Sequence, residues 1–130
     1  MSTLNRGPIR ALVVDDHPDV AEALARLLQA MGCAAAFVTE AAKAMDAATR
    51  MDPELVFLDI VMPGMHGYDL ARTLRTRYGD AIQLVAVTAY DDASHHAISR
   101  DARFDATVKK PVGVDTLQSI LATAAAQRSR

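Results

Sequence analysis

The sequence has few of the residues and runs that define several protein classes. It has one cysteine, Cys33, in 130 residues, so no disulfide can form within the chain, and a reducing, cytoplasmic compartment is expected. It has no tryptophan and only 5% aromatic residues, which disfavours stacking platforms for single-stranded nucleic acid. No apolar run approaches the ~18 residues of a membrane helix, so membrane insertion is not expected. The first eight residues have no apolar core, which argues against a secretory signal.

An excess of charge of either sign is also missing. The 14 basic and 16 acidic residues leave a net charge of −2, which argues against broad electrostatic binding to nucleic acid or anionic membranes. The hydrophobic fraction of 51% is that of a globular chain rather than a disordered one. A chain of this length is expected to form one domain whose core needs no metal or disulfide for stability.

Apolar runs alternate with helical patterns along the chain. The runs predict strands over residues 9–14, 33–38, 54–59, 82–88 and 105–109. The spacing of apolar residues predicts helices over 20–31, 40–51, 67–77, 92–102 and 113–127. The expected buried face of the first helix comprises Val20, Leu24, Leu27, Leu28 and Met31. That of the last helix comprises Val114, Leu117, Ile120, Leu121 and Ala124.

Five β–α units in a row define the expected fold class. Strands that are apolar on both faces are typical of a parallel sheet covered by helices. We therefore predict a single α/β, flavodoxin-like, doubly wound (βα)5 domain with strand order 2-1-3-4-5. The domain is expected over residues 9–127, after a flexible N-terminal tail of residues 1–8. A closed eight-stranded barrel would need about twice the chain.

Polar residues stand where the predicted strands end. They are Asp15 and Asp16 after the first strand, Asp59 at the third, Thr88 at the fourth, and Lys109 and Lys110 at the fifth. In a parallel sheet these ends meet at one edge, where ligands bind. Any one of the aspartates alone would more simply be a turn or cap residue. Their joint placement favours a functional site.

This set of side chains suits a phosphoryl group held beside a cation. Three crowded carboxylates repel one another and need a positive partner. Oxygen ligands select Mg²⁺ or Ca²⁺, and a site with few ligands favours Mg²⁺. A lysine ammonium and a threonine hydroxyl can both bind phosphoryl oxygens. Asp59, the one acid at the end of the central strand, is the candidate nucleophile.

Four segments together resemble the receiver domain of two-component response regulators. They are LVVDDHP (12–18), LVFLDIVMPGMHGYDL (55–70), LVAVTAY (84–90) and VKKP (108–111). The resemblance covers residues 9 to about 125. It implies a phosphoacceptor protein rather than an enzyme. Its partner would be a histidine kinase or a histidine phosphotransfer protein that donates a phosphoryl group from a phosphohistidine.

The resemblance also implies a role for each matching residue. Asp59 would be the phosphoacceptor, with Thr88 and Lys110 contacting the phosphoryl group. Lys109 is expected to be a solvated surface charge.

The implied Mg²⁺ site has four members. Asp16 would bind the metal directly, and Asp15 directly or through a water. Asp59 and the backbone carbonyl of Val61 would complete the protein ligands.

Several alternatives stay open at this point. An aspartyl phosphatase of the haloacid dehalogenase type also uses a strand-end aspartate and Mg²⁺, but places a second aspartate where Val61 stands here. A degenerate receiver used only for docking is a further alternative. The segment RFDATVKKPV (103–112) resembles receivers of hybrid sensor kinases and of stand-alone regulators. Family analogy alone suggests a weak homodimer through the last two β–α units.

Overall fold

The computed structural model describes residues 7–60, 67–88 and 104–128. These residues form a five-stranded sheet in which every neighbouring pair is parallel. The strands are β1 (Arg10–Val14), β2 (Ala34–Val38), β3 (Leu55–Asp59), β4 (Gln83–Thr88) and β5 (Ala106–Lys109). Their order, β2-β1-β3-β4-β5, confirms the predicted flavodoxin-like topology.

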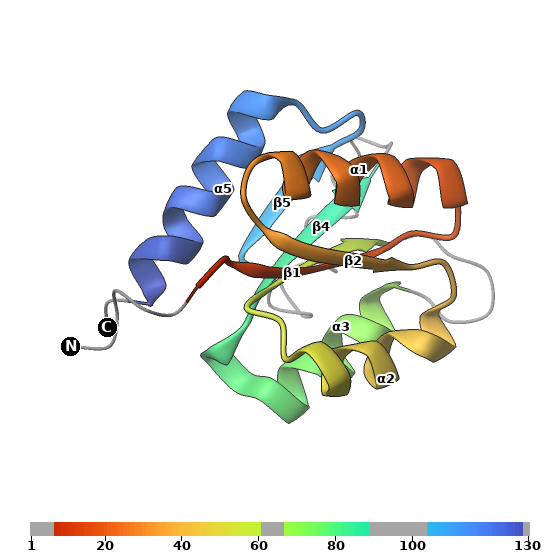
Figure 1. Ribbon diagram of the computed structural model, residues 1–130. Helices are drawn as coiled ribbons and strands as arrows, with labels where there is room; N and C mark the ends of the chain where they lie inside the picture. Colours follow the sequence, from red (N-terminus) through yellow and green to blue (C-terminus); the bar gives the residue numbers. More distant parts are fainter. Residues whose placement is uncertain (1–6, 61–66, 89–103, 129–130) are drawn as a thin grey trace.

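Helices cover both faces of the sheet. They are α1 (Pro18–Ala30), α2 (Ala41–Met51), α3 (Gly67–Tyr78) and α5 (Val114–Gln127), with a short 3₁₀ turn η2 (Gly79–Ala81) after α3. Figure 1 shows α1 and α5 on one face and α2 and α3 on the other. The helix predicted over 92–102 lies outside the described residues. Within those residues, no helix is long and apolar enough to span a membrane.

Two buried clusters hold these layers together, one on each face of the sheet. Alternate residues of a strand point to opposite faces, so β1 and β3 contribute to both clusters. Toward α2 and α3 point Leu12, Val14, Val56 and Leu58. Toward α1 and α5 point Ala11, Val13, Leu55 and Phe57. Burial on both faces explains why these two strands read as unbroken apolar runs.

The buried face of α1 differs from the predicted one. Val20 is 41% exposed, whereas Ala21, Ala25 and Leu28 are buried. Small alanine side chains let the helix backbone approach the sheet closely, so the alanine stripe faces inward and Val20 turns toward solvent. Val114 on α5 is likewise exposed, so its predicted burial is wrong too.

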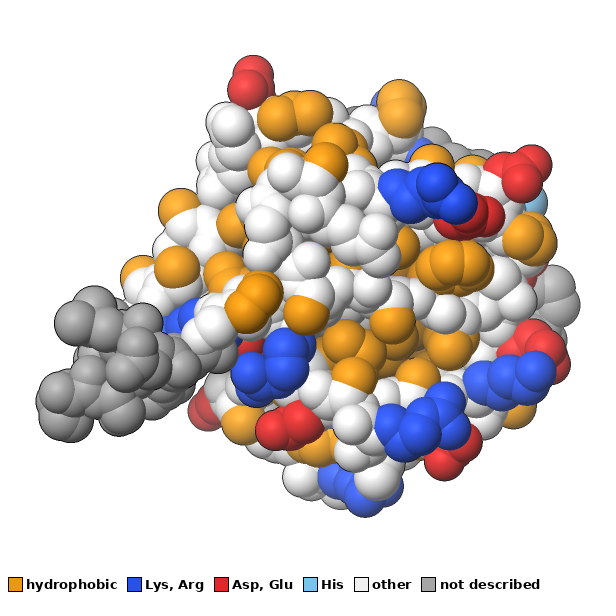
Figure 2. All heavy atoms as spheres, viewed as in Figure 1, with side chains coloured by type: hydrophobic (Ala, Val, Ile, Leu, Met, Phe, Trp, Pro, Cys, Tyr) orange, Lys and Arg blue, Asp and Glu red, His pale blue; other side chains and the backbone are white. Residues whose placement is uncertain are grey.

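The edge strand β2 also departs from the expectation that every strand is covered on both faces. Three of its five residues are exposed, and Phe37 is 39% exposed. An edge strand has only one neighbour, here β1, and helices cover it less completely. Figure 2 shows hydrophobic side chains lying between charged side chains of both signs on this side of the molecule.

Candidate functional site

The carboxyl ends of β1, β3, β4 and β5 bring the predicted polar residues together. Asp59 pairs with Val87 in the sheet register, and Thr88 pairs with Lys109, so these strands end at nearly the same level. The strand register thus confirms that Asp59, Thr88 and Lys109 lie at one edge of the sheet. Asp15, Asp59 and Thr88 are all buried there, although polar residues of these types are mostly exposed in proteins.

Lys110 links two of the aspartates. Its Nζ lies 2.8 Å from Oδ2 of Asp15 and 3.3 Å from Oδ2 of Asp59. Partial burial acts to lower the pKa of Lys110, but the hydrogen bond with Asp15 and the charges of Asp59 and Asp15 outweigh it, so its pKa is raised. The ammonium therefore stays charged at neutral pH and offsets part of the negative charge here.

Asp16 and His17 are the more exposed members of the cluster. The backbone N–H of His17 donates to Oδ1 of Asp15 at 3.0 Å. The His17 Nδ1 lies 3.3 Å from Oδ1 of Asp15 and 3.3 Å from Oδ1 of Asp16. Even so, Oδ1 of Asp16 is buried and finds no hydrogen-bond partner among the residues described. A buried carboxylate oxygen without a partner is unfavourable, and a bound cation would satisfy it.

Four side chains could together hold a metal ion. Asp15, Asp16, His17 and Asp59 each offer one ligand atom, and these atoms all lie within 4.8 Å of one another. The donor set is mainly carboxylate oxygen, which fits Mg²⁺. His17 was not singled out from the sequence, where its position directly after the aspartate pair was the available signal. Val61, the fourth predicted ligand, lies outside the described residues.

Local sequence explains why the aspartates after β1 point into this edge. His17 has extended backbone (φ −92°, ψ 108°) and precedes Pro18, which suits the first turn of α1 because its missing N–H is not needed there. The chain thus turns directly from β1 into α1. The N-terminus of α1 faces the carboxylates and favours negative charge.

The ends of β4 and β5 are joined next to the acidic residues. The Lys110 backbone N–H donates to the Thr88 carbonyl oxygen at 2.7 Å. Thr88 is buried, while Lys109 is exposed, in agreement with its predicted place on the surface. The side chain of Lys110 points toward Asp15 and Asp59.

Gly67, the first residue of α3, packs directly on the backbone at the end of β3. A Cβ at this position would lie 2.4 Å from Cα of Ile60 and 2.6 Å from the carbonyl oxygen of Asp59. The Gly67 N–H also donates to the Ile60 carbonyl oxygen at 3.3 Å. The backbone that carries Asp59 therefore depends on a residue without a side chain.

A largely apolar groove of about 520 Å³ opens beside the acidic edge. Val20, Leu24 and Leu27 of α1 form one wall, and Pro111 and Val112 lie on the other. The groove reaches Asp15, Asp59 and Lys110. It is thus continuous with the polar cluster.

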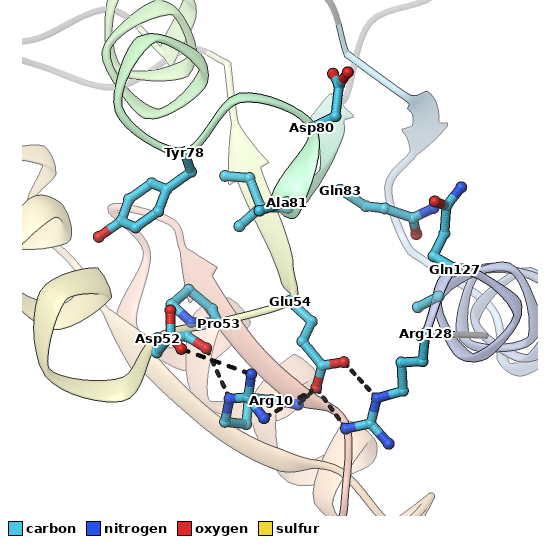
Figure 3. Close-up of a pocket in the computed structure, with 12 residues that line it drawn as sticks. Arg10, Asp52, Pro53, Glu54, Tyr78, Asp80, Ala81, Gln83, Gln127 and Arg128 are labelled. Carbon is cyan, nitrogen blue, oxygen red and sulfur yellow. Dashed lines mark hydrogen bonds and ion pairs between the residues drawn. The ribbon is translucent and has the colours of Figure 1, made fainter. Parts of the chain in front are cut away.

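A second cavity, of about 470 Å³, lies at the opposite edge of the sheet, where the strands begin. Figure 3 shows Glu54 between the guanidinium groups of Arg10 and Arg128. Arg128 Nη2 donates to Oε1 of Glu54 at 2.6 Å, and Arg10 Nε donates to the Asp52 carbonyl oxygen at 2.7 Å. Arg128 also donates to the carbonyl oxygens of residues 7 and 8. These hydrogen bonds and ion pairs hold the end of α5 against the start of β1. We infer that their role is to stabilise the fold.

Glu54→Gln is expected to destabilise the fold by about 2 kcal/mol at pH 7, since both Glu54 and Arg128 are mostly shielded from solvent. Burial acts to raise the pKa of Glu54, but the hydrogen bonds and charges of Arg128 and Arg10 outweigh it, so the pKa is lowered. A depressed folded-state pKa contributes stability above the unfolded value of roughly 4.3, and this is lost as pH falls through the folded value.

The difference between parent and variant should therefore shrink as the pH falls below about 4. Urea unfolding at a series of pH values measures it. Glu22→Gln is the matched control, because the Glu22–Arg26 pair lies on an exposed face of α1 and contributes about 0.5 kcal/mol or less. A loss that does not depend on pH would contradict the assigned role of the Glu54 charge.

Comparison with known proteins agrees with this geometry. The family model described as the response regulator receiver domain matches residues 11–122. The DNA-binding response regulator MtrA of Mycolicibacterium smegmatis is 36% identical over 102 residues, which is 78% of this chain and 44% of that protein. The response regulator MprA of a Mycobacterium species is 34% identical over 110 residues, covering 85% of this chain and 47% of that protein.

Solved structures show the same fold. The response regulator protein TrrA from Thermotoga maritima, in complex with Mg(2+)-BeF, superposes with a TM-score of 0.79 at 30% identity, covering 89% of this chain and 98% of that one. A CheY-like receiver domain protein from Methanospirillum hungatei superposes with a TM-score of 0.85 at 21% identity, covering 95% and 98%.

The chain belongs to the response regulator receiver domain family. It is a phosphoacceptor signalling domain of the two-component type rather than an enzyme, and receivers of this family work with histidine kinases. The chain spans about half the length of the curated relatives it matches.

Proposed function

We propose that Asp59 is the residue that accepts the phosphoryl group. The observation that carries this is the position of its carboxylate, buried at the end of the central strand and 3.3 Å from the Lys110 ammonium. In the transfer, an Asp59 carboxylate oxygen forms a bond with phosphorus while the bond from phosphorus to the donor imidazole nitrogen breaks. The imidazole leaves with the electron pair of that bond.

Lys110 and Thr88 are proposed to stabilise the product. The Lys110 ammonium can shift from Asp59 to a phosphoryl oxygen while keeping its contact with Asp15 at 2.8 Å. Thr88 ends the neighbouring strand and can donate its hydroxyl proton to a second phosphoryl oxygen.

Asp15, Asp16 and Asp59 are proposed to hold Mg²⁺, and the Val61 carbonyl stays a predicted further ligand. The buried Oδ1 of Asp16, which accepts no hydrogen bond from the residues described, supports a cation at this place. When bound, Mg²⁺ would supply positive charge where the phosphoryl oxygens gather. The Mg(2+)-BeF complex of the Thermotoga relative, at 30% identity, also supports the choice of metal.

Phosphorylation by a small phosphoryl donor is the test of this function. Intact-mass measurement should show one added phosphate in the presence of Mg²⁺ and little when the metal is chelated. Peptide mapping should place the phosphate on β3. Equal phosphorylation with and without the chelator would overturn the proposal.

Asp16→Asn should reduce the rise in melting temperature that Mg²⁺ produces, because the variant binds the metal more weakly. Without metal, its melting temperature should be higher than that of the parent, because repulsion between the carboxylates is relieved.

The groove along α1 is proposed as the contact surface for the donor protein. A phosphohistidine must come within bonding distance of Asp59, and the groove reaches Asp59. The donor is proposed to be a histidine kinase or a histidine phosphotransfer protein with an apolar helix face that fits between α1 and Val112.

Val20→Asp is expected to slow transfer from a phosphohistidine protein by tenfold or more, because it places a charge in this groove. Phosphorylation by the small donor should stay within about twofold of the parent rate. Stopped-flow or quenched transfer assays measure both. Val114→Asp is the matched control, since Val114 is exposed to a similar extent but does not line the groove. Equal losses with both donors would contradict a docking role.

The extent and subclass of the domain stay predictions. We propose a receiver over residues 9–127 in the cytoplasm, with no direct contact to nucleic acid from its own residues and at most weak homodimerisation. Resemblance of segment 103–112 to hybrid-kinase and stand-alone receivers is the basis for the subclass, whereas MtrA is named a DNA-binding regulator. The complete reading frame around this segment would decide between them.

A further inference from the structure

Of the four side chains in the acidic cluster, His17 offers a nitrogen atom as a metal ligand, whereas the three aspartates offer oxygen. We propose that His17 supplies an imidazole ligand to the metal site and so shifts its preference from Mg²⁺ toward divalent transition metals such as Ni²⁺. This inference rests on the metal site of the proposed function. It concerns the choice of metal and not the acceptor.

Geometry places the imidazole within reach of a shared ion. Its Nδ1 is 3.3 Å from one oxygen of Asp15 and 3.3 Å from one oxygen of Asp16, and the four ligand atoms of the cluster lie within 4.8 Å. Opposite ligands of an ion with bonds of roughly 2.1 Å lie about 4.2 Å apart. The cluster therefore has to contract by well under 1 Å across its widest pair.

The His17 side chain can make that adjustment. It is 67% exposed, so its ring can turn without disturbing the core. Its backbone is held in place by the hydrogen bond to Asp15 and by the start of α1 at Pro18. Among the four side chains of the cluster, the imidazole is the most exposed.

Ligand chemistry makes the contribution of His17 unequal between metals. Mg²⁺ prefers carboxylate, carbonyl and water oxygens, whereas imidazole is a good ligand for zinc, copper, iron and nickel. Removing the imidazole should therefore weaken Ni²⁺ binding far more than Mg²⁺ binding. If His17 acted only by its charge or by orienting Asp15 and Asp16, both affinities would change by a similar factor.

Calorimetric titration of the whole chain with Mg²⁺ and, separately, with Ni²⁺ is the experiment. The chain has four histidines. The reference protein should therefore carry glutamine at His66, His95 and His96, so that their side chains cannot bind Ni²⁺. Adding His17→Gln to this reference should weaken Ni²⁺ binding tenfold or more and change the Mg²⁺ dissociation constant by less than about twofold. Asp16→Asn should weaken binding of both metals.

The outcomes separate this inference from the proposed function. If Mg²⁺ binds the reference protein but the ratio of the two affinities does not move with His17→Gln, the imidazole is not a ligand and the inference is wrong. An equal loss for both metals overturns it as well, in favour of a positioning role. If the reference protein binds no Mg²⁺, the proposed metal site fails, and this inference fails with it.

Discussion

Asp59→Asn is expected to abolish phosphorylation by any donor, with a rate at least a hundredfold below that of the parent. An amide lacks the anionic oxygen that attacks phosphorus, and it is nearly the same size as the carboxylate it replaces. The variant should fold, because Lys110 keeps its contact with Asp15. Intact-mass measurement after treatment with a small donor, together with unfolding by urea, checks both expectations.

The control for this result is Asp46→Asn. Asp46 is exposed on α2, where it pairs with Arg50, and its loss should leave phosphorylation unchanged. A phosphate that persists at the parent level on the Asp59 variant would transfer the acceptor role to Asp15 or Asp16. Peptide mapping distinguishes these two from Asp59, because they follow β1 instead of ending β3.

The same substitution should also change the metal-free protein. Asp59 is one of three crowded carboxylates, and removing its charge relieves repulsion with Asp15 and Asp16. It also removes the weaker of the two contacts of Lys110, at 3.3 Å. These effects oppose each other, so we expect the free energy of unfolding to change by about 1 kcal/mol or less.

The sequence predicted the helices and strands of this fold well, because the spacing of their apolar residues largely matches which residues are buried. Strands β1 and β3 are covered on both faces, and their apolar runs are typical of buried parallel strands. Their polar ends followed directly, since a parallel sheet gathers its carboxyl ends at one edge. The sequence alone therefore predicts that Asp15, Asp59 and Lys110 lie close together.

Side-chain detail was predicted less well, because it depends on contacts between elements distant in sequence. Helical spacing predicted a buried face of α1 that includes Val20, but close packing on the sheet buries Ala21 and Ala25 and leaves Val20 exposed. His17 joins the acidic cluster only because α1 begins where it does.

A buried arginine shows the same limit. Arg75 of α3 donates to Asp105 at 2.9 Å and to the Gly79 carbonyl oxygen at 2.7 Å. These contacts tie the end of α3 to the start of β5, yet Arg75 lies on a helix whose other charges are mostly exposed. Nothing in the local pattern distinguishes it from a surface residue.

Gly67→Ala is expected to combine a large loss of stability with a loss of phosphorylation. The added Cβ would lie 2.4 Å from Cα of Ile60 and 2.6 Å from the carbonyl oxygen of Asp59, closer than non-bonded atoms can approach. Both partners are backbone atoms of a buried strand end, so no side chain can rotate away. Forced shifts of this kind cost about 1–3 kcal/mol, and we expect the upper end of that range.

The effect of Gly67→Ala on phosphorylation depends on which backbone segment moves to relieve the contact. Relief of the contact displaces either the start of α3 or the peptide of Asp59 and Ile60, and the second shifts the Asp59 carboxylate relative to Lys110. A misplacement of about 1 Å can reduce a reaction rate a hundredfold. Phosphorylation by a small donor should therefore slow by tenfold or more, even at temperatures where the variant is still folded.

The control variant is Gly113→Ala. Gly113 has φ −84° and no atom within 4 Å of an added Cβ, so alanine fits there with at most a modest effect at the start of α5. Urea unfolding gives the loss of stability, and intact-mass kinetics give the rate. The prediction is wrong if Gly67→Ala is as stable and as readily phosphorylated as Gly113→Ala. The chain would then relax around the new methyl group without moving Asp59, and the close contact at Gly67 would not matter for phosphorylation.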